Sequence, residues 1–222
     1  MKPRRTLLLG LLAVTLVLNF NLFLELLVPC IVFFLLVPVV GDALGLVAAS
    51  CCLNTSSLWE ACRMAPWVPT PAADLHELLR HSSNEGTFLE LGSGDGRNLM
   101  LALDVGFNRS IGLEWSPVLV AVSSMRAWLW DKGDRMVTLR ADMMADPIPT
   151  EHVTAIYLYL SDGTLEALAP RLACAFAASE ASVLSRDFAL PGWGKPRLRL
   201  ERGLTTLLLY NTLDPQVPRS PC

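Results

Sequence analysis

Two features of the sequence have the residue types and spacing that ligand binding requires: a glycine-rich loop and a later glutamate. The loop reads Glu90-Leu91-Gly92-Ser93-Gly94-Asp95-Gly96 and directly follows a short apolar run. Glycines in this position let the backbone turn sharply after a strand and approach a ligand closely. Glu114 stands 18 residues beyond Gly96, at the end of the next predicted strand. A carboxylate there can accept hydrogen bonds from both hydroxyls of a ribose.

The spacing of the loop disfavours a dinucleotide. In a dinucleotide fingerprint a small residue would follow at position 97, where the helix must pack closely on the strand. This chain has Arg97 instead. Asp142, after the third predicted strand, stands where this kind of fold contacts adenine, although aspartates also end strands as turn formers. Met143 and Met144 beside it would pack on the adenine or fill the core.

Apolar runs and helical spacing predict the elements that position these residues. Buried or alternating runs predict strands at 87–91, 110–114, 136–140, 155–160 and 181–186. Helices are predicted at 72–81, 97–104, 117–130 and 165–177, and a closing hairpin at 197–201 and 205–210 around Gly203. Strands that alternate with helices imply an α/β fold with a doubly wound, Rossmann-like, mostly parallel sheet. The hairpin adds antiparallel strands at its end.

An unusually apolar segment precedes this domain. From Thr6 to Leu53 only Glu25 and Asp42 carry charge, and Lys2, Arg4 and Arg5 precede the run. A bilayer span needs about 20 apolar residues, so the run predicts a transmembrane anchor, either as one tilted span or as a two-span hairpin. A cleaved signal peptide is the less favoured alternative, because the run is longer than a signal requires. The predicted divisions are an anchor at 1–53, a junction at 54–71 and a catalytic domain at 72–222.

Charge and composition exclude other classes of function. The net charge of −3 argues against a nucleic-acid partner, which requires a basic excess. The chain has three histidines and no Cys-x-x-Cys pair, so no metal site is expected.

Four motifs together resemble a known family. They occur in the order Pro66-Trp67-Val68-Pro69-Thr70, Leu91-Gly92-Ser93-Gly94-Asp95-Gly96-Arg97, Gly112-Leu113-Glu114-Trp115-Ser116-Pro117 and Arg186-Asp187-Phe188-Ala189-Leu190-Pro191-Gly192-Trp193. This set resembles the small, membrane-anchored class I methyltransferases of mitochondria that modify lysines of the ATP synthase c subunit and the adenine nucleotide translocase. The sequence departs from that family at Tyr159-Leu160-Ser161-Asp162-Gly163, where a Phe-Gly-Val-Pro-like run is usual, and at Trp115 and Ser116. The departures lie near the expected acceptor site and leave the substrate open.

The resemblance implies an activity, a cofactor and a location. It implies a membrane-tethered protein-lysine N-methyltransferase that uses S-adenosylmethionine. It also implies partners, namely the lipid bilayer and a membrane-protein substrate with a target lysine. The implied location is the mitochondrial inner membrane with the catalytic domain on the matrix side; the endoplasmic reticulum and a bacterial inner membrane are alternatives. The cofactor-binding residues would be Glu90, Gly92, Gly94, Gly96, Glu114 and Asp142.

Three further residues are predicted to serve the methyl acceptor. A lysine acceptor must lose its charge, and an apolar or aromatic channel favours the neutral amine. Tyr159 and Trp193 follow the fourth and fifth predicted strands and are assigned to the acceptor pocket, and Asp162 to holding the amine or taking its proton. Packing is the alternative for the two aromatic residues, and helix capping for Asp162. Methylation of a small or lipophilic molecule, and an inactive membrane scaffold with the same fold, remain open as other functions.

Overall fold

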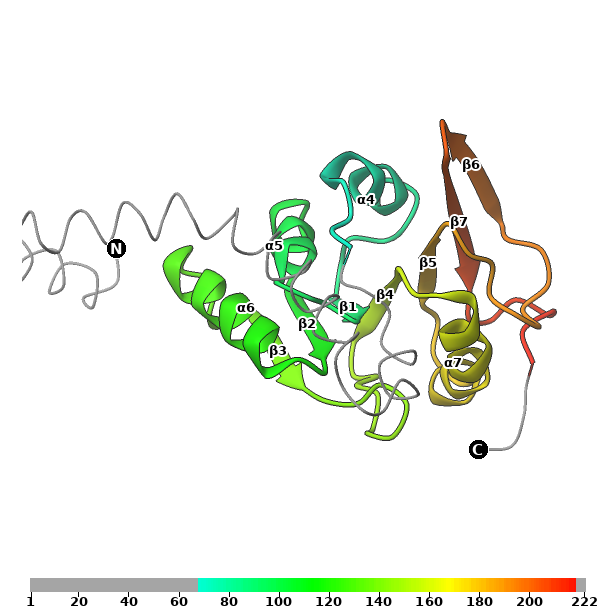
Figure 1. The fold of residues 1–222 in the computed structure, drawn as a ribbon. Helices are drawn as coiled ribbons and strands as arrows, with labels where there is room; N and C mark the ends of the chain where they lie inside the picture. The colour runs from blue at the N-terminus through cyan, green and yellow to red at the C-terminus, as the bar shows by residue number, and fades with distance from the viewer. Residues whose placement is uncertain (1–67, 219–222) are drawn as a thin grey trace, which may run out of the picture. The chain divides into compact units, whose positions relative to one another are not determined.

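The computed structural model describes residues 68–218 of the chain, and seven strands in this part form one sheet. The strands are β1 (Thr87–Leu91), β2 (Arg109–Glu114), β3 (Met136–Arg140), β4 (Val153–Leu158), β5 (Ser182–Arg186), β6 (Leu198–Arg202) and β7 (Thr205–Asn211). The helices of this part are α4 (Ala72–Leu79), α5 (Arg97–Asp104), α6 (Pro117–Leu129) and α7 (Asp162–Ala175). Figure 1 shows the sheet with α4 and α5 on one side and α7 on the other.

The strand order is β3-β2-β1-β4-β5-β7-β6. Strands β1 to β5 run parallel, whereas β7 pairs antiparallel with both β5 and β6. The predicted doubly wound sheet with a closing antiparallel hairpin is therefore confirmed. The chain changes direction across the sheet between β1 and β4, and ligands of such sheets bind at the carboxyl ends of the strands at this switch point.

Both faces of the central strands are covered, which explains why they read as continuous apolar runs. All five residues of β1 are buried. Because strand side chains alternate between faces, Phe88 packs with α4 and α5, and Leu89 packs with α7. The two apolar clusters fix the sheet between its helices and hold the carboxyl ends of the strands in place.

The starts of α6 and α7 follow local capping chemistry. Ser116 precedes Pro117, and its hydroxyl accepts a hydrogen bond from the amide of Leu119 at 3.4 Å. Proline suits the first helical position because its nitrogen has no hydrogen to donate. Helix α7 begins at Asp162, three residues before the predicted start of 165, because Ser161 is extended and takes the N-cap position. Strand β4 is shifted likewise: it spans 153–158, not the predicted 155–160.

The predicted membrane segment cannot be compared with the structure. Residues 1–53 and most of the junction at 54–71 lie outside the described residues. Within residues 68–218, no helix has both the length and the apolar character of a bilayer span.

Candidate functional site

The glycine-rich loop connects β1 to α5 at the switch point of the sheet. Gly92, Gly94 and Gly96 all have positive φ angles, of 79°, 55° and 75°. Residues with side chains avoid this left-handed region. At Gly96 space is limiting as well, since a Cβ atom there would collide with Ser123 of α6. The loop therefore needs glycine for its backbone conformation and for its packing on the neighbouring helix.

Glu114, at the end of β2, is hydrogen-bonded to this loop. Its Oε2 accepts the amide hydrogen of Gly94 at 2.8 Å, and its Oε1 accepts that of Ser116 at 2.8 Å. The residue is only 8% exposed. Each carboxylate oxygen can accept a second hydrogen bond. Glu114 is thus fixed against the loop and retains acceptor capacity for a ligand hydroxyl.

Glu90 of β1, just before the loop, is a second buried carboxyl group. Its Oε1 accepts a hydrogen bond from Asn98 Nδ2 at 2.7 Å. Its Oε2 is buried and has no hydrogen-bond partner within residues 68–218. Burial raises the pKa of Glu90 well above its ordinary value, and the charges of Asp95 and Glu114 raise it further, against the opposing effect of Asn98. A cationic ligand group at Oε2 would satisfy this oxygen and favour the carboxylate.

Two arginines hold the loop at Asp95, which the sequence did not lead us to expect. Arg97 Nη2 lies 2.9 Å from Asp95 Oδ2, and Arg126 Nη2 lies 2.7 Å from the same oxygen. Arg126 Nε also donates to the backbone oxygen of Asp95 at 3.0 Å. Arg97, at the position that would be small in a dinucleotide loop, thus turns back onto Asp95. Arg126 is the only charged residue of α6, and that isolation was the one signal of its role in the sequence.

Asp142 lies beyond the end of β3 and is half-buried. Its Oδ1 accepts the amide hydrogen of Met144 at 2.8 Å, the bond of an Asx turn. The turn brings Met143 close to the loop, because a Cβ atom on Gly92 would lie 3.6 Å from the Met143 methyl carbon. The structure therefore shows the turn-forming role of Asp142, while its contact with adenine stays a prediction.

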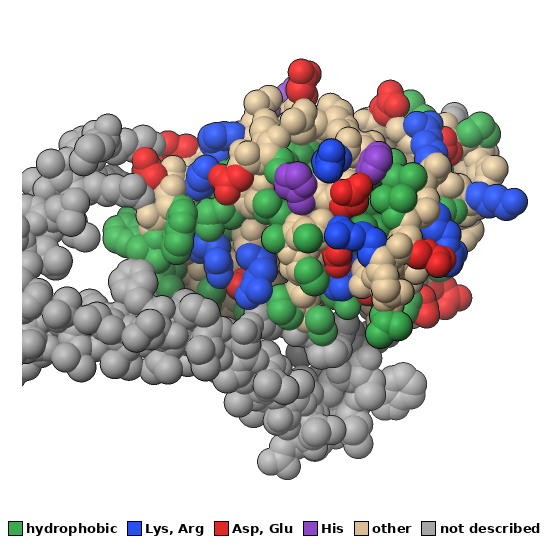
Figure 2. Space-filling model, turned by 90° about the horizontal axis from the view of Figure 1, so that it is seen from above, with side chains coloured by type: hydrophobic (Ala, Val, Ile, Leu, Met, Phe, Trp, Pro, Cys, Tyr) green, Lys and Arg blue, Asp and Glu red, His purple; other side chains and the backbone are tan. Residues whose placement is uncertain are grey.

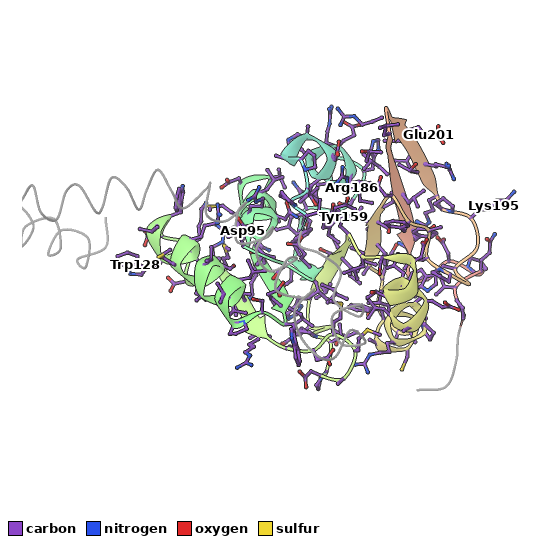
Figure 3. All side chains as sticks on the ribbon, viewed as in Figure 1. Asp95, Trp128, Tyr159, Arg186, Lys195 and Glu201 are labelled. Carbon is purple, nitrogen blue, oxygen red and sulfur yellow. The ribbon has the colours of Figure 1, made fainter. Side chains whose placement is uncertain are left out.

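Tyr159 follows β4 and is half-buried beneath an arginine. The guanidinium carbon of Arg186 lies 4.5 Å from the centroid of the Tyr159 ring, a cation–π arrangement. Arg186 is itself buried and lies 3.3 Å from Asp74 of α4. Figure 3 shows Tyr159 and Arg186 together beneath α4. The sequence motif contained Arg186, but nothing in it indicated this contact.

The segment before α4 is connected to the same region. Thr70 Oγ1 and the Tyr157 hydroxyl are 2.9 Å apart and form a buried hydrogen bond. Burial raises the pKa of Tyr157 far above its usual range, so it stays protonated. Tyr157 is the register partner of Glu90 on the adjacent strand. Thr70 thus joins the segment before α4 to β4, next to the strand that carries Glu90.

The two other residues predicted for the acceptor lie in different surroundings. Asp162 is exposed in the first turn of α7, after the N-cap residue Ser161. Trp193 is 1% exposed in the core. Its Nε1 donates to the backbone oxygen of Ala169 at 3.2 Å, and its ring meets Tyr210 edge-on at 6.2 Å. This placement favours packing for Trp193, and no hydrogen bond or ring contact in the described chain joins it to Tyr159 or Asp162.

Comparisons with known proteins point to one kind of domain. The model of the ANTKMT methyltransferase domain family matches residues 90–197. A lysine N-methyltransferase of the ATP synthase c subunit, from Mus musculus, is 37% identical over 43% of this chain and 38% of its own length. Adenine nucleotide translocase lysine N-methyltransferase of Mus musculus is 27% identical over 58% of this chain and 55% of its own.

A solved structure agrees with the fold. An RNA methyltransferase from Salinibacter ruber, in complex with S-adenosyl-L-homocysteine, superposes with a TM-score of 0.60 and 25% identity. The match covers 70% of this chain and 99% of that one. The chain spans only about half, or less, of the length of the two curated relatives. Within that span, the comparisons confirm the resemblance to lysine methyltransferases of the ATP synthase c subunit and the adenine nucleotide translocase, built on the class I methyltransferase sheet.

Proposed function

We propose that this chain is an S-adenosylmethionine-dependent protein-lysine N-methyltransferase that acts on membrane proteins and is tethered beside them by residues 1–53. The observation that carries the proposal is the pair of buried glutamates beside the glycine-rich loop, one on β1 and one at the end of β2. Glu90 has a buried oxygen without a hydrogen-bond partner in the described chain, and Glu114 is fixed against Gly94. The curated relatives named above support lysine as the acceptor.

The residues present fit the cofactor by charge and by hydrogen-bonding type. Glu90 Oε2 would bind the cationic amino group of the methionine part, and Glu114 the ribose hydroxyls. When bound, the cofactor supplies a methyl group on a sulfonium and leaves as a neutral thioether. Gly92, Gly94 and Gly96 adopt the positive φ angles of the loop, so that its backbone can approach the ligand closely. Asp142 and Met143 lie next to the loop, on the side assigned to adenine.

On the acceptor side, the chain must deliver a neutral amine and keep water out. The half-buried Tyr159 ring, covered by Arg186, offers an aromatic wall at the carboxyl end of β4. A lysine that enters beside this wall loses hydration, which favours its neutral form. Asp162 is exposed on the same edge of the sheet and is suited to take the proton released after transfer. Trp193 supports the region from the core without touching the acceptor.

The proposed location follows from the relatives and the sequence. We propose the mitochondrial inner membrane, with the catalytic domain on the matrix side. The basic start of the chain (Lys2, Arg4 and Arg5) favours the matrix side for the amino terminus, and a two-span hairpin in the apolar run that follows would return the catalytic domain to that side. The net charge of −3 does not suit an RNA substrate.

The test is transfer of a tritiated methyl group to isolated membranes. The full chain is incubated with membranes and the labelled cofactor, after which proteins and lipids are separated. The proposal expects the label in a protein band, on lysine after acid hydrolysis. Glu114→Gln serves as the matched control and should transfer far less. Label in the lipid or small-molecule fraction would favour a lipophilic acceptor, and a chain that fails to bind the cofactor in calorimetry would contradict the enzyme assignment.

A further inference from the structure

Helix α6 exposes large apolar side chains and buries small ones. Val118 is 54% exposed and Trp128 is 60% exposed. Only Ser123 and Ala127 of this helix are buried. Surface helices normally bury their apolar side chains and expose polar ones. Figure 3 shows Trp128 on the outer side of α6, and Figure 2 shows hydrophobic side chains gathered on the same, left side of the domain.

Three exposed apolar residues of α6 and one half-buried one, Met125, lie on one face. Val118, Ala121, Met125 and Trp128 recur at intervals of three and four residues, which places them along one side of a helix. Trp115, just before the helix, is 55% exposed. Trp130, at the end of the helix, is 54% exposed, but it follows Trp128 by two residues and therefore projects from another side. We call Val118, Ala121, Met125, Trp128 and Trp115 the indole face.

The indole face carries no charge. The single charged residue between Glu114 and Asp131 is Arg126. Its guanidinium points inward and is bound to Asp95, at 2.7 Å from Oδ2 and 3.0 Å from the backbone oxygen. Two of the six tryptophans of the chain, Trp115 and Trp128, therefore belong to an exposed surface without a formal charge.

We propose that the indole face docks on the lipid–water interface of the membrane that the chain is tethered to. Indole rings have an apolar body and one polar N–H, and they are enriched where headgroups meet acyl chains. An apolar face without charge also suits the core of a protein–protein interface, and it is the predicted tether to a bilayer that favours lipid as the occupant. The inference rests on the membrane tether in the proposed function: residues 6–53 contain only two charges and are long enough to span a bilayer.

Docking through α6 would also orient the active site. Trp115 directly follows Glu114, the residue assigned to the ribose, so the indole face begins at the carboxyl edge of β2. Contact between this face and the membrane would hold the mouth of the site near the headgroups. Loops of membrane proteins emerge there, which is where the proposed lysine acceptors would be found. The tether brings the domain to the bilayer, and the indole face would set which side of the domain faces it.

The experiment uses the full chain in phosphatidylcholine vesicles whose acyl chains carry bromine near the headgroup end. Bromine quenches a tryptophan only on close contact. We expect strong quenching in the parent chain and a clear loss of the quenched fraction in Trp128→Phe and in Trp115→Phe. Trp193→Phe should not lower the quenched fraction, because Trp193 is buried in the core and its emission is not quenched in the parent chain. High salt should not reduce quenching, since the face has no charge to screen.

A pair of charge substitutions provides the matched control. Ala121→Glu places a carboxylate in the middle of the indole face, and Ala167→Glu places one on the exposed side of α7. The first should lose much of the quenching, and the second should retain it.

Flotation of the vesicles separates the two proposals. A chain that floats, yet is quenched equally with and without its α6 tryptophans, overturns the docking and leaves the tether intact. A chain that does not float contradicts the tether and the docking together. If the chain self-associates in detergent, Val118→Arg abolishes this association, and brominated lipid does not quench the parent chain, the face binds a second copy of the chain instead of lipid.

Discussion

At the scale of single residues, Glu90 is expected to respond to the ligand through its protonation state. Burial raises the pKa of this carboxyl group in the folded chain. The folded state therefore holds a proton on Glu90 over a pH range in which the unfolded chain has lost it. By linkage, the stabilising contribution is fully present below the unfolded value, about 4.3. It is lost as pH rises toward the raised pKa of the folded state.

The amide substitution Glu90→Gln separates stability from ligand binding. It preserves an oxygen for the hydrogen bond from Asn98 and removes the ionisable group. We expect Glu90→Gln to unfold at a higher urea concentration than the parent at neutral pH, and its stability to depend less on pH. The slope removed is at most about 1.4 kcal/mol per pH unit. Its affinity for S-adenosylmethionine should fall, because an amide does not attract the amino group as a carboxylate does. Equal calorimetric affinity in both proteins would show that Glu90 does not bind the cofactor.

The carboxylate of Glu114 has two roles: it accepts hydrogen bonds from the Gly94 and Ser116 amides, and it is assigned to bind the ribose hydroxyls of the cofactor. Glu114→Ala removes the acceptor of the Gly94 and Ser116 amides together with that of the hydroxyls. We expect cofactor binding to weaken by about 1.5–3 kcal/mol, the scale of a hydrogen bond to a charged group. Glu114→Asp serves as the comparison, since it retains the charge but shortens the side chain. A folded Glu114→Ala protein that binds as tightly as the parent in calorimetry would refute the ribose assignment.

At the scale of elements, α6 holds the glycine-rich loop from the side. Arg126 Nη2 lies 2.7 Å from Asp95 Oδ2, and the Asp95 side chain is only 5% exposed. This contact joins a residue of the loop to α6, 31 positions along the chain. The conformation of the loop therefore depends on how α6 packs on the sheet as well as on its own glycines.

Arg126→Gln tests this support. The substitution leaves Asp95 with Arg97 alone among the arginines, so we expect a looser loop and a several-fold rise in the Kd for the cofactor. Arg135→Gln is the matched control: Arg135 donates to the backbone oxygen of Asn108 at 2.8 Å, at the opposite ends of the strands. Both variants should lose some thermal stability, but only the first should lose affinity. If both lose affinity alike in calorimetry, the support by Arg126 is not specific to the loop.

The elements themselves were largely predictable from the sequence. The strand at 87–91 and the helix at 97–104 are confirmed to the residue, because a buried apolar run, three glycines and helical spacing follow each other without ambiguity. Strand β4 lies two residues earlier than predicted, because Tyr159 and Leu160 continue the apolar run but do not pair with a neighbouring strand. Helix α7 begins three residues earlier than predicted, because Ser161 takes the N-cap position.

Contacts between distant side chains could not be predicted. The pairing of Asp95 with Arg126 and the stacking of Arg186 on Tyr159 each join different elements. Sequence patterns give the face of a helix or strand, but not the partner of one long side chain. Trp193 shows the same limit: its position after a strand suggested the site, whereas the packing of Tyr210 and α7 around its ring placed it in the core.

At the scale of the whole molecule, acidic side chains gather at the ligand-binding edge of the sheet. Glu114 ends β2, and Asp142 and Asp162 follow β3 and β4, whereas the charge of Asp95 is balanced by Arg97 and Arg126. The proposed cofactor is a sulfonium, and the proposed acceptor is an amine that arrives as an ammonium. An acidic edge attracts both, which raises their encounter rate, and this attraction weakens as salt increases.

The tether determines which acceptors the chain can reach. Attachment to the bilayer confines the enzyme with membrane proteins, at an effective concentration of up to about millimolar for a short linker. We expect a chain that begins at Trp59 to bind the cofactor as the full chain does. It should lose most of its activity on native membranes and retain activity on the same acceptor when this is solubilised in detergent and supplied in excess.

The measurement is the rate of tritiated methyl transfer by both chains on both preparations, with protease protection on sealed organelles to locate the catalytic domain. Protection of the Asp187–Trp193 region should match the side on which the cofactor is available. The rate of the chain that begins at Trp59 is divided by the rate of the full chain, once on native membranes and once in detergent. A lower ratio on native membranes than in detergent shows the effect of the tether, separate from any general loss of activity. The indole face adds a second expectation: Ala121→Glu in the full chain should lower the rate on native membranes and leave the rate in detergent unchanged, because only the first depends on how the domain lies against lipid. If the chain that begins at Trp59 modifies native membranes as fast as the full chain, residues 1–53 do not select the substrate.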